Sequence, residues 1–141
     1  MSVEGLDEVL RNMDQISGKV NDALQDGLLA SAAMVQSEAV KSIARGVKSG
    51  RVYTRGRITH QASAPGEAPA TDNGALVRGF QIEDAFINQN VVFVLNNSDH
   101  ADPLEFGTSK IAARPFLFPA LEGSRKKIMK EIRSQIERAL K

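Results

Sequence analysis

"PLEFGTSKIAARPFLFPALEG", residues 103–123, is the stretch that decides how this chain closes its fold. It contains three prolines and three phenylalanines and has neither helical nor strand periodicity. A residue before proline avoids the helical region, so Arg114 is expected to be extended. Pro119 suits the first turn of a helix, which we predict over residues 119–140. The stretch is therefore either a catalytic loop or a shaped connector that delivers the last helix.

Phe116 and Phe118 bear on that choice, because they place large apolar area just before the last helix. If they point to opposite sides, only one can be buried in its own monomer. The other is then free to fill a pocket of a neighbouring molecule. Which of the two crosses to a neighbour is left open by the sequence.

In the N-terminal part of the chain, apolar residues at steps of three and four predict helices over residues 3–16 and 19–45, with a break at Ser17-Gly18. Alanines in the second helix permit close approach of another element. Gly46 is its expected stop, because glycine accepts the left-handed conformation that ends many helices.

The middle of the chain changes character. Residues 51–60 predict a hairpin that turns near Arg55-Gly56, and residues 62–72 form a proline-rich arm. A short helical segment follows over residues 73–79, and residues 80–95 predict a second antiparallel hairpin turning at 88–90, whose apolar second strand suggests a central position. The expected fold is one α+β domain over residues 1–141, with an N-terminal helix pair, a small antiparallel sheet with hairpins and a C-terminal helix.

Composition narrows the class of protein. The chain has 141 residues, of which 42% are hydrophobic and 25% charged, as in globular domains rather than disordered or membrane proteins. It shows no basic-then-apolar secretion signal, so we expect it to stay in the compartment where it is made. The absence of cysteine excludes disulfides, thiolate metal sites and a cysteine nucleophile. A net charge of +1 gives no general reason to expect nucleic acid.

The sharpest enzymatic hypothesis uses Asp99, His100, Asp102 and Glu105 as metal ligands or as acid and base. The alternative, which we favour, is that these residues cap and solvate a turn. The only other histidine, His60, does not follow at helical spacing, so an H-E-x-x-H site cannot be built. A serine triad lacks a nucleophile elbow, and "APGEAP" is a poor phosphate cradle.

Arg51, Arg55 and Arg57 form a basic run that could contact DNA phosphates. These arginines could instead form a solvated hairpin tip or contact another protein. We favour either of these interpretations over DNA binding. Any DNA contact is expected to be weak and non-specific.

Two motifs then carry a resemblance. "GEAPATDNGALVRGF" at residues 66–80, followed by "LEFGTSKIAARPFLFPAL" at 104–121, resembles the HK97 gene-product-ten-like family of tailed-phage tail-component or tail completion proteins of the virion neck. The resemblance extends over nearly the whole chain. Its signature falls on Pro65, Gly66, Glu67, Pro69, Gly74, Leu76, Glu105, Phe106, Gly107, Thr108, Pro115, Phe116, Pro119 and Ala120. This sequence departs from the family at His100 and Phe118.

The resemblance implies a structural virion protein without enzymatic activity or cofactor, located at the neck and assembled in the host cytoplasm. It would join the tail tube to the head connector as a homo-oligomeric ring, expected to be a hexamer. Its partners would be itself, the tail tube or tail terminator protein and the head connector or stopper proteins, with no membrane. The alternatives are a head-closure or adaptor connector protein, a minor tail component, a metal-dependent hydrolase and a DNA-binding accessory protein.

Ring formation by a head-to-tail contact needs two different complementary surfaces on each subunit. The candidates are the hairpin tip, the arm and residues 103–123. Their residues are Arg51, Tyr53, Arg55, Arg57, Pro65, Gly66, Glu67, Pro69, Glu105, Phe106, Gly107, Thr108, Arg114, Pro115, Phe116, Phe118 and Pro119.

Overall fold

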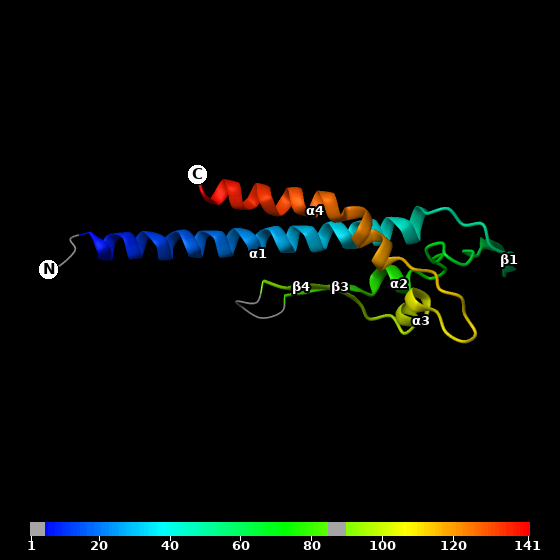
Figure 1. Cartoon of the computed structure of the whole chain (residues 1–141). Helices are drawn as coiled ribbons and strands as arrows, with labels where there is room; N and C mark the ends of the chain where they lie inside the picture. Colours follow the sequence, from blue (N-terminus) through cyan, green and yellow to red (C-terminus); the bar gives the residue numbers. More distant parts are fainter. Residues whose placement is uncertain (1–4, 85–89) are drawn as a thin grey trace.

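A computed structural model describes residues 5–84 and 90–141 of the protein and confirms the α+β class (Figure 1). A long N-terminal helix packs against a C-terminal helix, and two small antiparallel hairpins and two short helices lie along the other side and at the C-terminal end of the long helix. The elements in order are α1 (Leu6–Arg45), β1 (Val52–Arg55), β2 (Ile58–Gln61), α2 (Ala75–Arg78), β3 (Phe80–Asp84), β4 (Val92–Asn96), α3 (Ala101–Phe106) and α4 (Leu117–Ala139). Within the described residues, no helix is both long and apolar enough to cross a membrane.

The predicted break at Ser17-Gly18 is wrong, because α1 runs through it as one helix of 40 residues. A glycine in a helix interior costs about 1 kcal/mol relative to alanine but does not clash, and neighbouring turns carry the helix across it. Gly46 does end the helix, for a different reason from the one predicted. Its backbone is extended at φ −63° and ψ 154°, and a Cβ there would clash with the Ser42 carbonyl oxygen.

The two long helices pack against each other in opposite directions, and the N-terminal part of α1 projects beyond the end of α4 (Figure 1). Small residues make the close approach possible, as the alanine content predicted. A Cβ on Gly27 would lie only 3.1 Å from the Ile132 Cα atom. Ala23, Ser31 and Ala32 are buried on the same part of α1.

The core lies where the C-terminal half of α1 meets the start of α4, α2 and the second hairpin. Its buried members are Val35, Ala39, Ile43, Leu76, Phe80, Ala101, Phe116 and Ala120. The rings of Phe80 and Phe116 meet edge to face, with centroids 5.9 Å apart. Fully burying one such ring contributes about 1.5–3 kcal/mol, so Phe116 anchors the start of α4 to the core.

The hairpins form two separate two-stranded sheets. Val52 pairs with Gln61 in the first, and Phe80 pairs with Asn96 in the second. Both predicted hairpins are therefore present. The central position predicted for β4 is wrong, because among the described residues it pairs only with β3. Val92 and Val94 are half-buried on the side that faces α1 and α4, whereas Phe93 is exposed. Residues 88 and 89 of the predicted turn lie outside the described residues.

Candidate assembly surface

Glu105 determines where α4 begins. Its carboxylate accepts hydrogen bonds from the backbone N–H groups of Phe116 (2.8 Å), Leu117 (3.0 Å) and Phe118 (2.8 Å). The next residue, Pro119, has no N–H, so the amides that a helix start normally leaves unpaired are accounted for. The negative charge of Glu105 also interacts favourably with the positive end of the α4 dipole. This cap corrects the predicted start at residue 119, because the helix already begins at Leu117.

Gly107 and Thr108 close the loop between α3 and α4. Gly107 has φ +75°, and a Cβ there would lie 2.9 Å from the Ala113 nitrogen. The Thr108 N–H donates to the Ile111 carbonyl at 2.8 Å, and the Thr108 hydroxyl accepts from the Ile111 N–H at 3.1 Å. These contacts shape the chain's own turn, and Thr108 remains exposed, so the predicted interface role of the two residues stays a prediction.

Arg114 continues the same loop toward the helix. Its N–H donates to the Leu104 carbonyl at 2.7 Å, which ties the loop back to α3. Its side-chain Nε is buried and has no hydrogen-bond partner among the described residues. The extended approach before Pro115 is therefore held by the backbone of α3.

The choice between the two phenylalanines is decided by the structure. Phe116 is 2% exposed, whereas Phe118 is 64% exposed and Phe106 is 79% exposed. The separation arises because Phe116 lies just before α4 and Phe118 lies in its first turn, where positions i and i+2 point about 200° apart. Phe116 therefore does not protrude from the candidate surface, whereas Phe118 and Phe106 do.

Glu67 holds the arm in the way that Glu105 holds residues 114–121, "RPFLFPAL", which we call the elbow. Its carboxylate accepts from the Ser49 hydroxyl, from the Ser49 N–H at 2.9 Å and from the Ala64 N–H at 2.8 Å. The Ser49 hydroxyl, followed by the two backbone N–H groups, holds the pKa of Glu67 below its ordinary value. Glu67 therefore contacts its own chain, whereas Pro65 and Gly66 beside it are exposed.

Two further bonds dock the arm onto the rest of the molecule. The Gly66 N–H donates to the Ala113 carbonyl at 2.9 Å, joining the arm to the loop before α4. Lys48 Nζ donates to the Ser42 carbonyl at 3.0 Å and to the Ala68 carbonyl at 2.7 Å. Burial lowers the pKa of Lys48. Pro69 is buried as well and so offers no surface to a neighbour.

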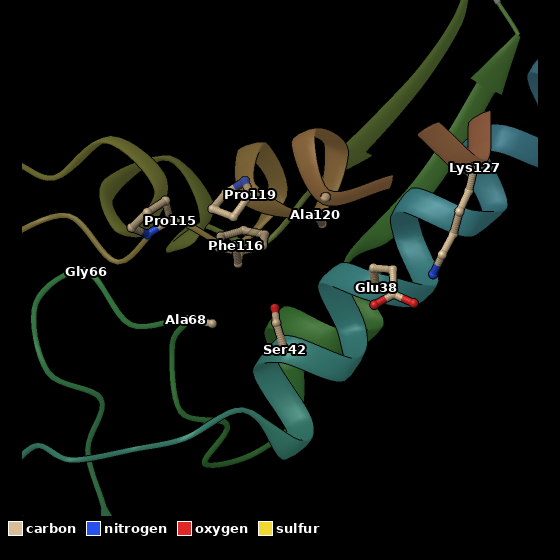
Figure 2. A pocket seen from close by; sticks show the side chains of 10 residues that line it. Glu38, Ser42, Gly66, Ala68, Pro115, Phe116, Pro119, Ala120 and Lys127 are labelled. Carbon is tan, nitrogen blue, oxygen red and sulfur yellow. The ribbon is translucent and has the colours of Figure 1, made fainter. Parts of the chain in front are cut away.

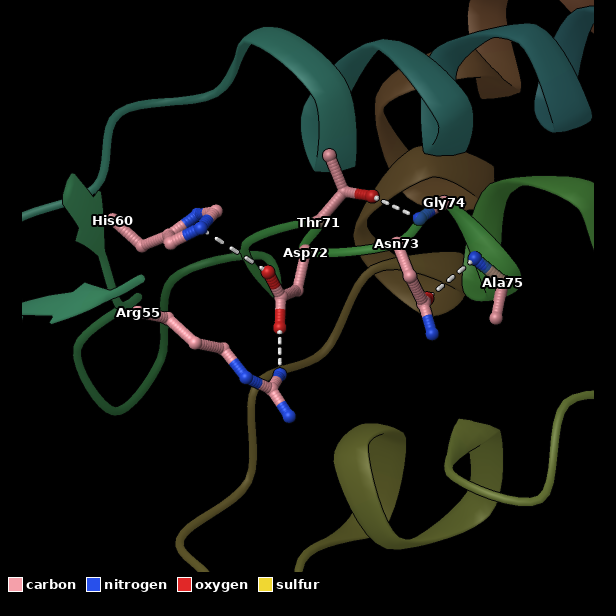
Figure 3. A network of polar contacts seen from close by, with 7 residues as sticks. All are labelled: Arg55, His60, Thr71, Asp72, Asn73, Gly74 and Ala75. Carbon is pink, nitrogen blue, oxygen red and sulfur yellow. Dashed lines mark hydrogen bonds and ion pairs between the residues drawn. The ribbon is translucent and has the colours of Figure 1, made fainter. Parts of the chain in front are cut away.

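Asp72 joins the first hairpin to the arm, and the sequence interpretation missed it (Figure 3). Its carboxylate accepts from Arg55 at 2.7 Å and lies 3.4 Å from His60 Nε2. The His60 ring stacks on Tyr53, with centroids 5.6 Å apart. In the sequence, Asp72 is visible only as the acid of "TDNG", a pattern that predicts a turn but does not identify the basic residue that pairs with it.

The same turn also starts α2. Thr71 Oγ1 accepts from the Gly74 N–H at 3.1 Å, and Asn73 Oδ1 accepts from the Ala75 N–H at 2.9 Å (Figure 3). Arg55 is thus held by Asp72, whereas Arg51 and Arg57 are exposed and make no ion pair within the described part of the chain.

A pocket of about 280 Å³ lies where the arm and the elbow meet α1 (Figure 2). The arm contributes Gly66 and Ala68. The elbow contributes Pro115, Phe116, Pro119 and Ala120, and α1 contributes Glu38 and Ser42. The hydrogen bond and charge of Lys41 lower the pKa of Glu38, and the more distant Lys127 of α4 acts in the same direction. Two segments that are far apart in the sequence thus form one preformed surface.

The residues of the metal-site hypothesis do not cluster in the described part of the chain. Asp99, His100 and Asp102 are exposed, and both oxygens of Glu105 are engaged by backbone amides. Among residues 5–84 and 90–141, no group of three or more histidine or carboxylate side chains is placed to hold a metal ion.

Comparison of the chain with protein-family models, curated proteins and solved structures found no match. The likeness to the phage family rests on the two quoted motifs, and it stays a prediction.

Proposed function

We propose that the protein is a structural component of the head–tail junction of a long-tailed bacteriophage. In this role it is a tail completion protein that forms a ring between the tail tube and the head connector. The observation that supports this best is the convergence of the "GEAP" arm and the "RPFLFPAL" elbow on one end of α1. Because hydrogen bonds tie both segments to the chain's own backbone, their shape is set before any partner binds.

Exposed apolar side chains beside that surface are suited to contact another protein. Phe106 and Phe118 are among the most exposed large apolar residues of the described chain, at 79% and 64%. Both lie next to Glu105, whose bonds fix the elbow. A rigid surface with protruding aromatic side chains loses little conformational entropy on binding, which favours assembly.

The charge of the chain also suits a ring through which DNA passes. Its net charge is only +1, and the exposed Arg51 and Arg57 lie on a small hairpin rather than on a long basic face. Strong phosphate contacts would impede passage of DNA, whereas weak ones would not. We expect DNA affinity to fall steeply with salt and to show no sequence preference.

The decisive test is to make phage particles without this protein. We expect filled heads and separate tails, and we expect purified protein to restore joining when it is added to them. A Phe106→Ala, Phe118→Ala double variant should restore joining at least tenfold less well. The matched control is Phe93→Ala, an exposed phenylalanine of β4 outside both motifs. Normal joined virions in the absence of the protein would refute the proposal.

A further inference from the structure

The N-terminal part of α1 carries an apolar stripe that nothing in the described chain covers. Leu6, Val9, Leu10, Met13 and Ile16 are 51%, 53%, 51%, 61% and 51% exposed. Single exposed apolar residues are ordinary on protein surfaces, but an aligned row of large ones is characteristic of an interaction surface. We call these five residues the α1 stripe.

The α1 stripe extends the face that α4 already covers. Leu6, Met13, Val20 and Gly27 are spaced by seven residues, so they stay nearly in line along the helix, drifting about 20° per step. Gly27 packs against Ile132 of α4, and α4 ends before it reaches the stripe (Figure 1). The stripe therefore continues an existing helix–helix contact without the second helix.

A second row of exposed apolar side chains lies along α4, away from its buried face. Phe118, Met129 and Leu140 are spaced by eleven residues, which is about three helical turns. They are 64%, 61% and 56% exposed and lie about 140° around the helix from the buried Ser124. We call these three residues the α4 row.

Charge indicates what covers the α1 stripe. Residues 6–26 contain five acidic and two basic side chains, a net charge of −3. Residues 117–139 of α4 contain six basic and three acidic side chains, a net charge of +3. Opposite charges favour docking of the α1 stripe on an α4 row, whereas pairing of two α1 stripes would bring acid against acid.

We infer that the α1 stripe of one copy packs on the α4 row of a second copy. The two surfaces differ, so the contact is head-to-tail and can close into a ring. The inference rests on the self-assembly in the proposed function, but not on the place of the protein in a virion.

The natural absence of cysteine allows a clean cross-linking test. Met13→Cys and Met129→Cys are prepared as separate proteins with different mass tags, mixed, and treated with a short bis-maleimide. Both methionines are 61% exposed, so neither change removes core packing. We expect the mixed cross-link at a yield at least tenfold above that of Gln15→Cys with Lys130→Cys. The control cysteines lie on the same helices, off the two rows.

Two other results of the cross-linking experiment would overturn the inference. Equal yields for the row pair and the control pair would show that the rows do not meet. A dominant Met13→Cys self-cross-link would show that two α1 stripes pair instead.

A charge exchange tests the same contact without cross-linking. Asp7→Lys with Asp14→Lys should weaken self-association at least tenfold, measured by sedimentation across concentration. Mixing that protein with one carrying Arg125→Glu and Arg133→Glu should restore association of the mixed pair. Failure of the second protein to restore it would count against the contact.

The outcomes separate this inference from the proposed function. If joining of heads and tails requires the protein but the row cross-link is absent, the ring uses other surfaces and the inference falls alone. If the cross-link forms but particles join normally without the protein, the inference stands and the proposed function falls.

Discussion

Removing the Glu105 carboxylate should destabilise the fold by loosening the start of α4. Three backbone N–H groups lose their acceptor in Glu105→Ala, because the carboxylate accepts the hydrogen bonds of Phe116, Leu117 and Phe118. A lost helix cap costs about 0.5–2 kcal/mol, with values near 1 typical. At about 1 kcal/mol for each of three partly solvated amides, the expected loss is about 3 kcal/mol.

Glu105→Gln should cost less, since the amide keeps the shape and one oxygen. That oxygen can retain the Phe116 and Leu117 bonds, which both end on the same carboxylate oxygen, Oε2. The amide NH₂ would face the Phe118 N–H, and the charge at the helix start is lost. Together these changes should cost about 1–2 kcal/mol.

Urea unfolding followed by far-ultraviolet circular dichroism measures both variants. With a slope of about 2 kcal/mol per molar urea, the midpoint of Glu105→Ala should fall by about 1.5 M. The control is Glu137→Ala, an exposed carboxylate on α4 without a hydrogen bond or ion pair among the described residues. A Glu105→Ala midpoint within about 0.25 M of the parent, at unchanged slope, would refute the capping role of Glu105.

Four further predictions follow from single sites. Phe116→Ala should lower the free energy of unfolding by about 3–5 kcal/mol, whereas Phe118→Ala should change it by less than about 0.5 kcal/mol, as thermal melts at fixed protein concentration will show. Gly107→Ala should cost more than Gly56→Ala in the same assay. Both glycines have positive φ, at +75° and +65°, but only at Gly107 does a Cβ meet backbone within 4 Å. Gly18→Ala should slow amide hydrogen exchange in the first half of α1 because a continuous helix gains about 1 kcal/mol from alanine, and faster exchange would argue for a break there. The lowered pKa of Glu67 should stabilise the fold fully above about pH 4.5. That contribution is lost as pH falls through the folded-state pKa, so Glu67→Gln should flatten the dependence of the urea midpoint on pH below about 4.5, and an unchanged slope would contradict the role of Glu67.

Local pattern was sufficient to predict much of the framework from the sequence. Apolar spacing predicted the helices that became most of α1 and α4, and it predicted both hairpins, because one-sided burial imposes a period on each element. The alanines of α1 predicted a close helix contact, which Gly27 and Ile132 make. The bend of residues 103–123 was also visible, since its prolines and Gly107 restrict the backbone locally.

Only the tertiary structure decided which residues contact one another and which side chains are buried. Nothing local distinguishes Phe116 from Phe118, and the difference arises because α4 begins between them. That start depends on Glu105, which caps the helix from eleven residues upstream. Asp72 likewise finds Arg55 across the arm. Each of these contacts joins residues that no sequence period relates, so the docked chain, and not its local pattern, selects which side chains stay inside and which remain free for a neighbour.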